Sequence, residues 1–519
     1  MQEATPFDFD SLFVFEIANN HQGLVAHGRR IIREISAVSR EAGVRGAIKL
    51  QLRDLDAFIH PAYRESKENK HIQRFLSTRL SETQFAELLA EVRQHGMTPI
   101  CTPFDEPSVD LAMRLGVDVI KIGSCSALDW PLLERVADAG RPVICSTGGL
   151  KIEEIDRIVS FFQHRGIQFA LMHCVAIYPT SNGGLHLGQI EALRNRYPRV
   201  PIGFSTHEEP GNLTAIGLAY AKGARLFEKH VGIATDGIQL NAYSATPAQV
   251  AAWLAAYRRA VEACGGEGER AISAEEVRDL RALMRGVYAK RALKTGAATR
   301  REDVFFAMPL LEGQLASGSW REGLVVDRDY AAGEALERRL RPERPTKKDI
   351  IYSTIHQVRG MLNTARIPLG HDFSVELSHH YGLERFYEIG CTLIECINRD
   401  YAKKLVIQLP GQWNPVHYHM KKDETFQILQ GALEVELEGK RRVLEPGDAV
   451  WIPCGVWHGF GTQTGVIFEE ISTRSYNDDS FYVDRVIARM PREERKTRLH
   501  NWGRHQFDDL SAEEGGENE

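Results

Sequence analysis

The chain has 519 residues, of which 43% are hydrophobic and 26% are charged, and its net charge is -6. One hydrophobic core rarely serves such a length, so we expect about three domains. Without a basic excess, nucleic acid and anionic membranes are not expected as partners, which leaves small molecules and further copies of the chain. The acidic start lacks a basic and then apolar leader, and no segment reaches the ~18 apolar residues of a membrane span. We therefore expect a cytoplasmic protein.

Eight short β-rich runs recur in the first half of the chain, and helix-like segments separate most of them. The runs cover residues 13–21, 47–52, 98–104, 119–124, 142–148, 169–175, 202–208 and 224–232. Several of the intervening segments end on a glycine, which is common at helix C-termini. Strand and helix alternating eight times predict an α/β fold, the TIM (β/α)8 barrel.

Each run begins apolar and ends in side chains that can do chemistry. In chain order these are Glu16, Asn19, Asn20 and His21; Lys49 and Gln51; Thr102; Lys121 and Ser124; Ser146 and Thr147; His173; Ser205 and His207; and Glu228 and His230. Barrel enzymes carry their active sites at the C-terminal ends of the strands, so these side chains are expected to converge on one mouth. The alternative is that the strands simply become polar as they leave the core.

Two kinds of site are predicted at this mouth. Lys49 and Lys121 indicate an anion site whose hydrogen bonds are completed by serines and threonines, Thr102 among them. Either lysine could instead be the buried partner of a carboxylate. His207 and His230 end adjacent predicted strands, so they can share a divalent ion and leave positions open for water and substrate.

The motifs "EIANNHQG", "IKLQ", "CTPFDEPSVD", "KIGS", "CSTGG", "MHCVAIYPT", "GFSTH" and "FEKHV" resemble, in this order, those of the sialic acid synthase family. That family condenses phosphoenolpyruvate with an aldose. The similarity covers roughly residues 10–265. Residues 286–340 form short strand-like pieces that predict a small β-rich domain, and they resemble the antifreeze-like (SAF) domain that follows the barrel in the family. The resemblance implies a phosphoenolpyruvate site made by Lys49, Lys121, Ser124, Ser146 and Ser205.

The same resemblance implies roles for four further residues. His207 and His230 would hold manganese or magnesium, Glu16 would be the acid/base near the aldehyde and the attacking water, and Tyr178 would line the sugar pocket. In this chemistry C3 of phosphoenolpyruvate attacks the polarised aldehyde, and water adds at C2 before phosphate leaves. A homodimer is also implied, because the antifreeze-like domain of the family reaches into a partner's active site.

The chain departs from the family pattern at three positions. Ala176 replaces an asparagine that would contact the phosphate, and Met308 replaces an arginine that would reach the N-acyl group of the sugar. Leu240 or Asn241 falls where an aspartate is expected. The last two losses argue against an N-acetylated hexosamine, because a site built around those groups would leave them unpaired with another sugar. We expect a plain neutral aldose.

The second half of the chain has a different character. The charged stretch "ERRLRPERPTKKD" (337–349) is the best linker candidate, so we expect domains at 1–268, 269–340 and 341–519. Closely spaced strand-like runs follow at 391–398, 403–409, 424–439, 448–453 and 466–473, separated by Gly, Pro and Asn turns. They predict an antiparallel double-sheet barrel.

Residues 411–431 match the first cupin motif, and residues 447–458 match the second. Period-2 alternation puts His417 and His419 on one face of a strand, and the following strands return Glu424 and His458 to the same interior. Three histidines and one carboxylate predict a divalent metal site for Mn, Zn or Fe.

The text around these motifs resembles the D-lyxose isomerase family of cupins, in which a metal and an acid/base pair shift hydrogen between C1 and C2 of a sugar. By that resemblance Lys422 and either Glu469 or Glu470 form the pair, although such residues on a hairpin are often solvated surface. The hypothesis is that the cupin makes the aldose that the barrel consumes. The alternatives are a non-catalytic sugar-binding or regulatory cupin, and a binding protein with two inactive sites.

Overall fold

The computed structural model describes residues 6–66, 68–266, 270–338, 345–476 and 478–503. The chain divides into two compact units, Met1–Ala271 and Ile272–Glu519. Within the described ranges, no helix has both the length and the apolar character needed to cross a bilayer.

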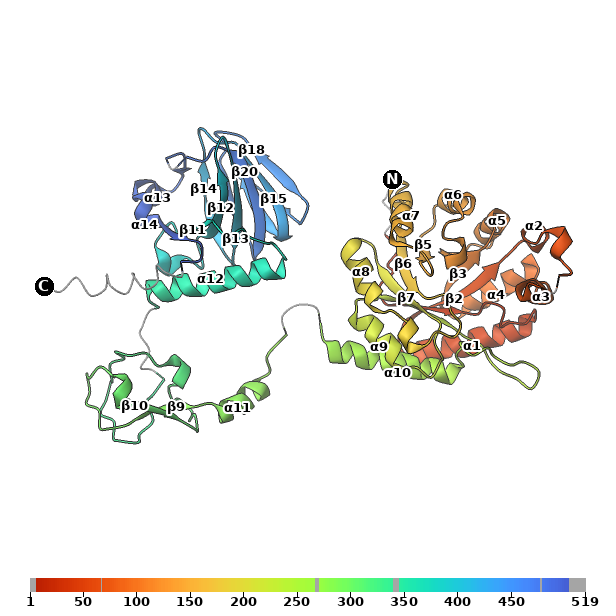
Figure 1. Cartoon of the computed structure of the whole chain (residues 1–519), viewed down its shortest axis with the longest axis horizontal. Helices are drawn as coiled ribbons and strands as arrows, with labels where there is room; N and C mark the ends of the chain where they lie inside the picture. Colours follow the sequence, from red (N-terminus) through yellow and green to blue (C-terminus); the bar gives the residue numbers. More distant parts are fainter. Residues whose placement is uncertain (1–5, 67, 267–269, 339–344, 477, 504–519) are drawn as a thin grey trace. The chain divides into compact units, whose positions relative to one another are not determined.

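The first unit is a closed barrel of eight parallel strands in chain order, as predicted (Figure 1). The strands are β1 (Leu12–Glu16), β2 (Arg45–Leu52), β3 (Thr98–Pro103), β4 (Val119–Ile122), β5 (Val143–Ser146), β6 (Phe169–Cys174), β7 (Ile202–Thr206) and β8 (Leu226–His230). Most strands end earlier than the apolar runs suggested, because the chain leaves the ladder as it reaches the mouth. Asn19, Asn20 and His21 consequently lie in the turns after β1.

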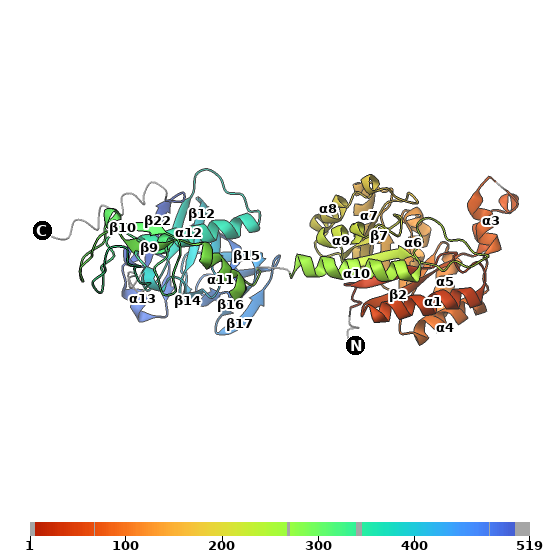
Figure 2. The same cartoon turned by 90° about the horizontal axis from the view of Figure 1, so that it is seen from below.

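Helices cover the outside of the barrel. They are α1 (Val25–Glu41), α2 (Leu55–Phe58), α3 (Lys70–Ser77), α4 (Glu82–Gln94), α5 (Glu106–Arg114), α6 (Trp130–Asp138), α7 (Ile152–His164), α8 (Gly188–Arg196), α9 (Thr214–Ala221) and α10 (Pro247–Cys264). Helix α10 starts at a capping box in which Thr246 and Gln249 satisfy each other's backbone N–H groups. It packs between α9 and α1, which Figure 2 shows from below.

Side chains inside the barrel form two layers because strand residues alternate between the two faces. The lower layer is a buried apolar cluster that includes Val14, Ala47, Ile100, Val119, Ile144 and Leu226. Two residues further along the same strands lie Glu16, Lys49, Thr102, Lys121, Ser146 and Glu228, all buried. The polar layer at the mouth therefore rests on an apolar floor.

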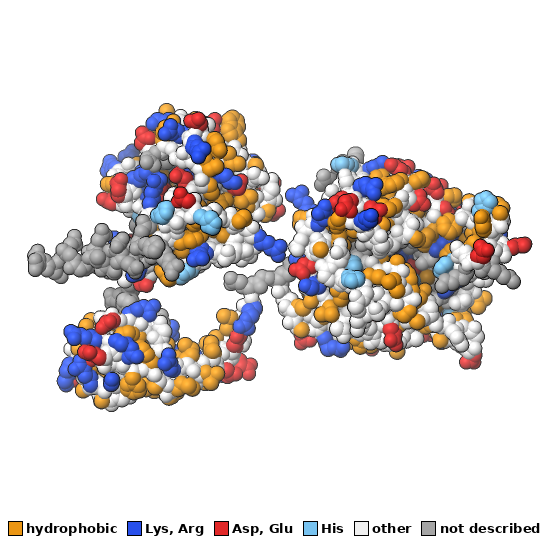
Figure 3. Space-filling model, viewed as in Figure 1, with side chains coloured by type: hydrophobic (Ala, Val, Ile, Leu, Met, Phe, Trp, Pro, Cys, Tyr) orange, Lys and Arg blue, Asp and Glu red, His pale blue; other side chains and the backbone are white. Residues whose placement is uncertain are grey.

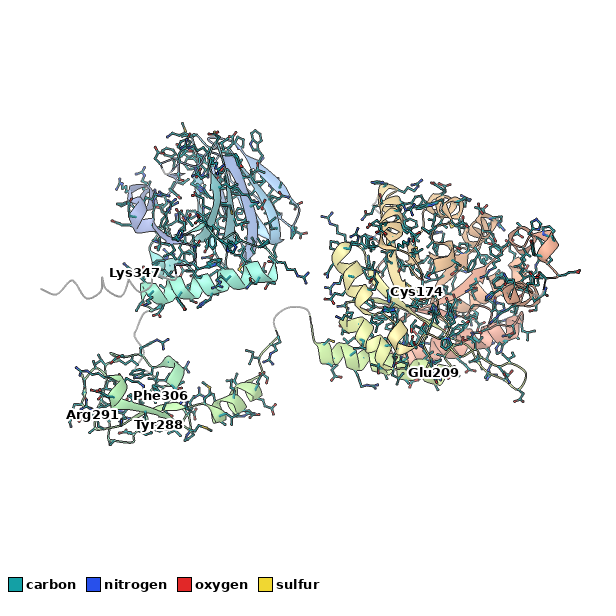
Figure 4. The ribbon with its side chains drawn as sticks, viewed as in Figure 1. Cys174, Glu209, Tyr288, Arg291, Phe306 and Lys347 are labelled. Carbon is teal, nitrogen blue, oxygen red and sulfur yellow. The ribbon has the colours of Figure 1, made fainter. Side chains whose placement is uncertain are left out.

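The second unit begins with helix α11 (Ala274–Leu283) and a small β-rich region. Its strands β9 (Gly286–Ala289) and β10 (Val304–Ala307) pair antiparallel. Figure 4 labels Tyr288 on β9, Phe306 on β10 and Arg291, whose Nε donates to Asp303 Oδ1 at 2.6 Å. Short strands were predicted here, but α11 was not.

The linker prediction is wrong for its last residues. Residues 339–344 lie outside the described part, and Lys347, labelled in Figure 4, begins helix α12 (Lys347–Thr364). Thr346 and Asp349 form a capping box, which is why the helix starts inside a charged stretch. Behind this charged start, Ile350, Ile355 and Val358 are buried in the cupin core.

The predicted double-sheet cupin is confirmed. Its strands are β11 (Ser374–Ser378), β12 (Cys391–Asn398), β13 (Tyr401–Gln408), β14 (Trp413–Tyr418), β15 (Glu424–Gly431), β16 (Leu433–Leu437), β17 (Lys440–Leu444), β18 (Ala449–Ile452), β19 (His458–Gly461), β20 (Val466–Thr473), β21 (Phe481–Tyr482) and β22 (Lys496–His500). One sheet has the order β18-β15-β20-β13-β12-β11-β22 and the other β17-β16-β19-β14-β21. Two short helices, α13 (Arg485–Arg489) and α14 (Arg492–Arg495), precede β22. Neither β11 nor β22 was predicted.

Candidate active and metal sites

A buried network of charges lies at the barrel mouth. Lys49 Nζ is 2.7 Å from Glu16 Oε2 and 2.8 Å from Glu228 Oε1. Lys121 Nζ donates to Ser146 Oγ at 2.7 Å and is 3.5 Å from Glu228 Oε2. Both lysines therefore have a carboxylate partner, as the alternative interpretation stated, and Lys121 is the more loosely paired of the two.

Burial and charge pairing shift the pKa values of this network in opposite directions. Burial disfavours the ionised form of Glu228, but Lys121 and Lys49 outweigh it and hold its pKa well below the usual range. Burial would likewise lower the pKa of Lys49, and the carboxylates of Glu16 and Glu228 raise it above its ordinary value. For Lys121 burial prevails and the pKa is lowered, because Glu228 only partly offsets it.

The hydroxyl groups predicted to complete an anion site differ in their hydrogen bonds. Ser205 Oγ donates to Glu228 Oε1 at 3.1 Å. Ser124 Oγ accepts from the backbone N–H of Gly148 at 3.0 Å and lies 3.0 Å from the sulfur of Cys174, which Figure 4 labels inside the barrel. Thr102 Oγ1 is buried and makes no hydrogen bond to the described residues. Its hydroxyl remains available to a ligand.

His207 and His230 face each other beside this network, with ring centroids 5.4 Å apart. His207 Nδ1 lies 2.9 Å from the carbonyl oxygen of Val175. A carbonyl only accepts, so Nδ1 carries the hydrogen and the Nε2 lone pair is free for a metal. Burial lowers the pKa of both histidines to about 3, which keeps them neutral at pH 7. These two residues fit a metal site that leaves positions for other ligands.

Aromatic side chains line the same opening. Tyr178 is 50% exposed, and its ring centroid is 4.2 Å from that of His207. Tyr243 lies 5.0 Å from Tyr178 and 5.0 Å from His230. Sequence reasoning had singled out Tyr178 but not Tyr243, which follows β8 in the irregular stretch "NAYS". Glu228 had been noted at a strand end without a role, yet it is the centre of the lysine network.

The cupin brings together the three predicted histidines. Possible ligand nitrogens of His417, His419 and His458 lie within 4.8 Å of one another, and all three side chains are buried. The Nδ1 atom of each donates to a backbone carbonyl: that of Pro415 at 2.9 Å, that of Asp479, and that of Val456 at 3.0 Å, respectively. The Nε2 lone pairs are therefore available together, as a metal site requires.

Glu424 completes the set. Its Oε2 lies 3.1 Å from His458 Nε2, and its Oε1 lies 3.5 Å from His419 Nε2. Burial opposes ionisation of Glu424, but Lys422 and His419 hold its pKa well below the usual range, so the group is a carboxylate. Two acceptors at such a short distance need a cation or a proton between them. The four predicted ligands thus fit a divalent metal.

Comparison with known proteins matches the two halves of the chain to two different families. Residues 36–269 match the NeuB family, and residues 404–468 match the Cupin domain family. The crystal structure of a protein assigned as spore coat polysaccharide biosynthesis protein E, from Chromobacterium violaceum, is 45% identical, with a TM-score of 0.62. That similarity covers 63% of this chain and 98% of the other. The chain belongs to the NeuB family.

Curated members of the NeuB family include synthases of acidic sugars. The N-acetylneuraminate-9-phosphate synthase of Drosophila melanogaster is 33% identical over 43% of this chain and 60% of its own length. The pseudaminic acid synthase of Campylobacter jejuni is 24% identical over 63% of this chain and 95% of its own length. This NeuB-family chain thus spans less than two thirds of the Drosophila synthase.

In the cupin of this NeuB-family chain, Lys422 is buried rather than solvated. Its ammonium contacts Glu424 and lies 2.9 Å from Glu470 Oε1, which Lys404 also approaches at 3.2 Å. Glu469 points to the opposite face of β20, where it pairs with Lys403 at 2.8 Å. Neighbouring strand residues face opposite ways, so of the two glutamates only Glu470 lines the cavity that holds the histidines.

Proposed function

We propose that the barrel condenses phosphoenolpyruvate with an aldose to give a 3-deoxy-2-ulosonic acid and phosphate, and that the cupin interconverts ketose and aldose to supply the sugar. The activities named for the NeuB-family relatives support the first part. The observation that carries it is the position of Lys49 and Lys121 near His207 and His230 at the barrel mouth.

In this proposal the barrel residues divide the work. Lys49 and Lys121 bind the phosphate and carboxylate of phosphoenolpyruvate, with hydrogen bonds from Ser146, Ser205 and Thr102, whose hydroxyl has no partner among the described residues. Glu16, whose Oε1 accepts the N–H of Ala18 at 2.6 Å, takes the proton of the attacking water. Manganese or magnesium held by His207 and His230 would polarise the aldehyde oxygen.

The sugar is proposed to be an aldose without an N-acyl group. Met308, which stands where the family's arginine reaches that group, is 56% exposed at the end of β10 and offers no hydrogen bond from its side chain. We also propose a cytoplasmic homodimer, because residues 286–340 resemble the antifreeze-like domain that completes a partner's site in the sialic acid synthase family.

In the cupin, Glu470 would take the proton from the sugar carbon and Lys422 would donate to the neighbouring oxygen. Both are buried and line the cavity next to the histidines. A divalent ion held by His417, His419, Glu424 and His458 would bind the sugar oxygens and favour loss of the carbon-bound hydrogen.

The barrel activity is tested by phosphate release from phosphoenolpyruvate with Mn²⁺ and a panel of aldoses. Lys121→Ala should abolish release, whereas Lys222→Ala, which removes an exposed lysine just after α9, should not. Release that is independent of aldose, or unaffected by Lys121→Ala, would refute the proposal.

The cupin activity is tested by deuterium exchange in D₂O without phosphoenolpyruvate, at C1 of ketoses and at C2 of aldoses, the carbons that lose hydrogen when the two interconvert. Glu470→Gln should abolish exchange. Glu469→Gln is the matched control, because it changes an adjacent glutamate on the opposite face. Absence of exchange with every pentose and hexose in metal-loaded protein would refute an isomerase.

One observation favours a second candidate, a cupin that binds sugar without converting it. Lys422 lies between Glu424 and Glu470, and Lys404 also contacts Glu470. The carboxylate of Glu470 is therefore paired with two ammonium groups. Binding of a sugar without hydrogen exchange, at C1 of a ketose or C2 of an aldose, would favour this function.

A further inference from the structure

The cupin cavity has a basic wall in addition to the histidines. Strands β11 and β22 and helix α14 form this wall, and basic and acidic side chains gather on the cupin surface near α13 and α14 (Figure 3). Three of its cations share one buried carboxylate: Glu376 is 2.6 Å from Lys496, 2.9 Å from Arg498 and 3.2 Å from Arg492. Glu376 is therefore fully engaged.

Arg495, on the same wall, has no carboxylate partner among the described residues. Its Nε and Nη1 atoms are buried and make no hydrogen bond to the described residues. Its guanidinium carbon lies 4.9 Å from the ring centre of Tyr482. A ring face attracts a cation but does not replace the in-plane acceptors that guanidinium N–H groups require.

Tyr482 connects this arginine to the metal ligands. Its ring centroid is 5.3 Å from that of His417, and the two rings are stacked. His380, 1% exposed, also faces the cavity at 5.3 Å from Tyr482, and its Nδ1 has no hydrogen-bond partner in the described chain. His380 Nε2 donates to Asn414 Oδ1 at 2.8 Å, so its Nδ1 is an acceptor. One sugar could thus contact the histidines at one end and, at the other, the donors of Arg495 and this acceptor.

The balance of charge in the cavity favours an anion. Its lining includes six lysines and arginines against four glutamates, before the charge of any metal is added. Glu376, Glu424 and Glu470 already contact lysines, arginines or histidines of the lining. Buried guanidinium nitrogens without an acceptor, such as Nε and Nη1 of Arg495, are costly, and a ligand that carries two oxygens in one plane would remove that cost.

We propose that the ligand of the cupin is an anionic sugar, bearing a carboxylate or a phosphate that Arg495 binds while the sugar hydroxyls reach the histidine site. The inference rests on the proposed function only in placing a sugar in this cavity. It narrows the substrate class: a sugar phosphate or sugar acid also lacks an N-acyl group, but it is not the neutral aldose that the sequence suggested. Arg495 is a binding residue in this account.

The test is calorimetric titration of the full-length, Mn²⁺-loaded protein with D-fructose, D-fructose 6-phosphate and D-gluconate. An anionic sugar should bind the wild type more tightly than fructose. Arg495→Gln should weaken that binding by roughly 10- to 100-fold, as expected for hydrogen bonds to a charged group. Arg489→Gln is the control, because Arg489 is an exposed arginine on α13 outside the cavity lining. Because the barrel can also bind anions, the difference between wild type and Arg495→Gln reports the cupin.

The outcomes distinguish a phosphate from a carboxylate on the ligand, and they distinguish this inference from the proposed isomerase activity. Tighter binding of fructose 6-phosphate would show that the bound group is a phosphate, and tighter binding of gluconate would show that it is a carboxylate. In either case the preference must disappear in Arg495→Gln. Unchanged affinity in Arg495→Gln, or no preference over fructose in the wild type, overturns the inference. If Arg495→Gln does not fold, Arg495→Lys decides, since it keeps the charge and loses the planar pair of donors. Arg495-dependent binding without hydrogen exchange, at C1 of a ketose or C2 of an aldose, would leave this inference standing and refute the isomerase. Exchange at C1 of fructose that Arg495→Gln does not affect would do the reverse.

Discussion

The Nε2 atom of His458 lies 3.1 Å from Oε2 of Glu424, and neither atom has a hydrogen-bond partner among the described residues. Since Nδ1 of His458 donates to Val456, this is a contact between two acceptors in a buried place. Removing one ligand should therefore remove the cation. We predict that His458→Ala binds about one Mn²⁺ per chain less than the wild type, as measured by elemental analysis after dialysis. His371→Ala, an exposed histidine outside the set, should keep the wild-type metal content, and equal loss in both variants would contradict the assignment.

Glu376 should make the stability of the cupin depend on pH in the acidic range. Burial would raise the pKa of Glu376, but Lys496 and Arg498 outweigh it and lower the pKa from 4.5 to about 2. Because the folded pKa is the lower one, the stabilisation is complete above pH 4.5 and is lost as the pH falls toward 2. The shift corresponds to about 3 kcal/mol of unfolding free energy. Glu376→Gln should lower the melting temperature at pH 7 and flatten its decline below pH 4.5, as measured by calorimetry. An acid decline as steep as that of the wild type would contradict this.

Sequence patterns predicted the barrel well because each element there carries its own local signal. The polar residues at the ends of the eight apolar runs indicated which side chains lie at the mouth of the barrel. Because strand residues alternate between two faces, Glu16, Lys49 and Lys121 lie two residues beyond apolar positions that face the barrel interior. The candidate metal-binding residues of the cupin followed from residue spacing alone. In both places the chemistry depends on residues close together on one strand or at equivalent ends of neighbouring strands.

The basic wall of the cupin could not be predicted in this way. Glu376 and Lys496 are 120 residues apart, and they meet because β11 pairs with β22. The stretch that carries Arg492 and Arg495 has the composition of a solvated surface. Similarly, nothing local distinguishes Glu469 from Glu470 until the register of β20 is known.

Ala176 gives a test of the phosphoenolpyruvate assignment by gain of affinity. It is exposed in the loop after β6, where the sialic acid synthase family has an asparagine. Ala176→Asn should lower the KM for phosphoenolpyruvate by roughly tenfold, the value of one hydrogen bond to a charged group, with a smaller effect on kcat. An unchanged or higher KM would argue that the phosphate lies elsewhere.

Glu228 should be essential to the folded barrel. Glu228→Gln removes a carboxylate from both Lys49 and Lys121 and leaves buried cations short of a partner, which typically costs about 3–5 kcal/mol of unfolding free energy. Glu82→Gln breaks an exposed pair with Arg114 and should cost much less, because solvent screens the pair. Denaturant titration of the two variants checks the difference, and equal small losses would show that the network does not stabilise the barrel.

The most direct test of the two-site account is phosphate release from phosphoenolpyruvate with Mn²⁺, using matched ketoses and aldoses, for the wild type and for His417→Ala. The account predicts that a ketose supports turnover only when His417 is present, whereas the matching aldose supports turnover in both proteins. Turnover with aldoses alone, equal in the two proteins, would contradict a cupin that supplies the barrel.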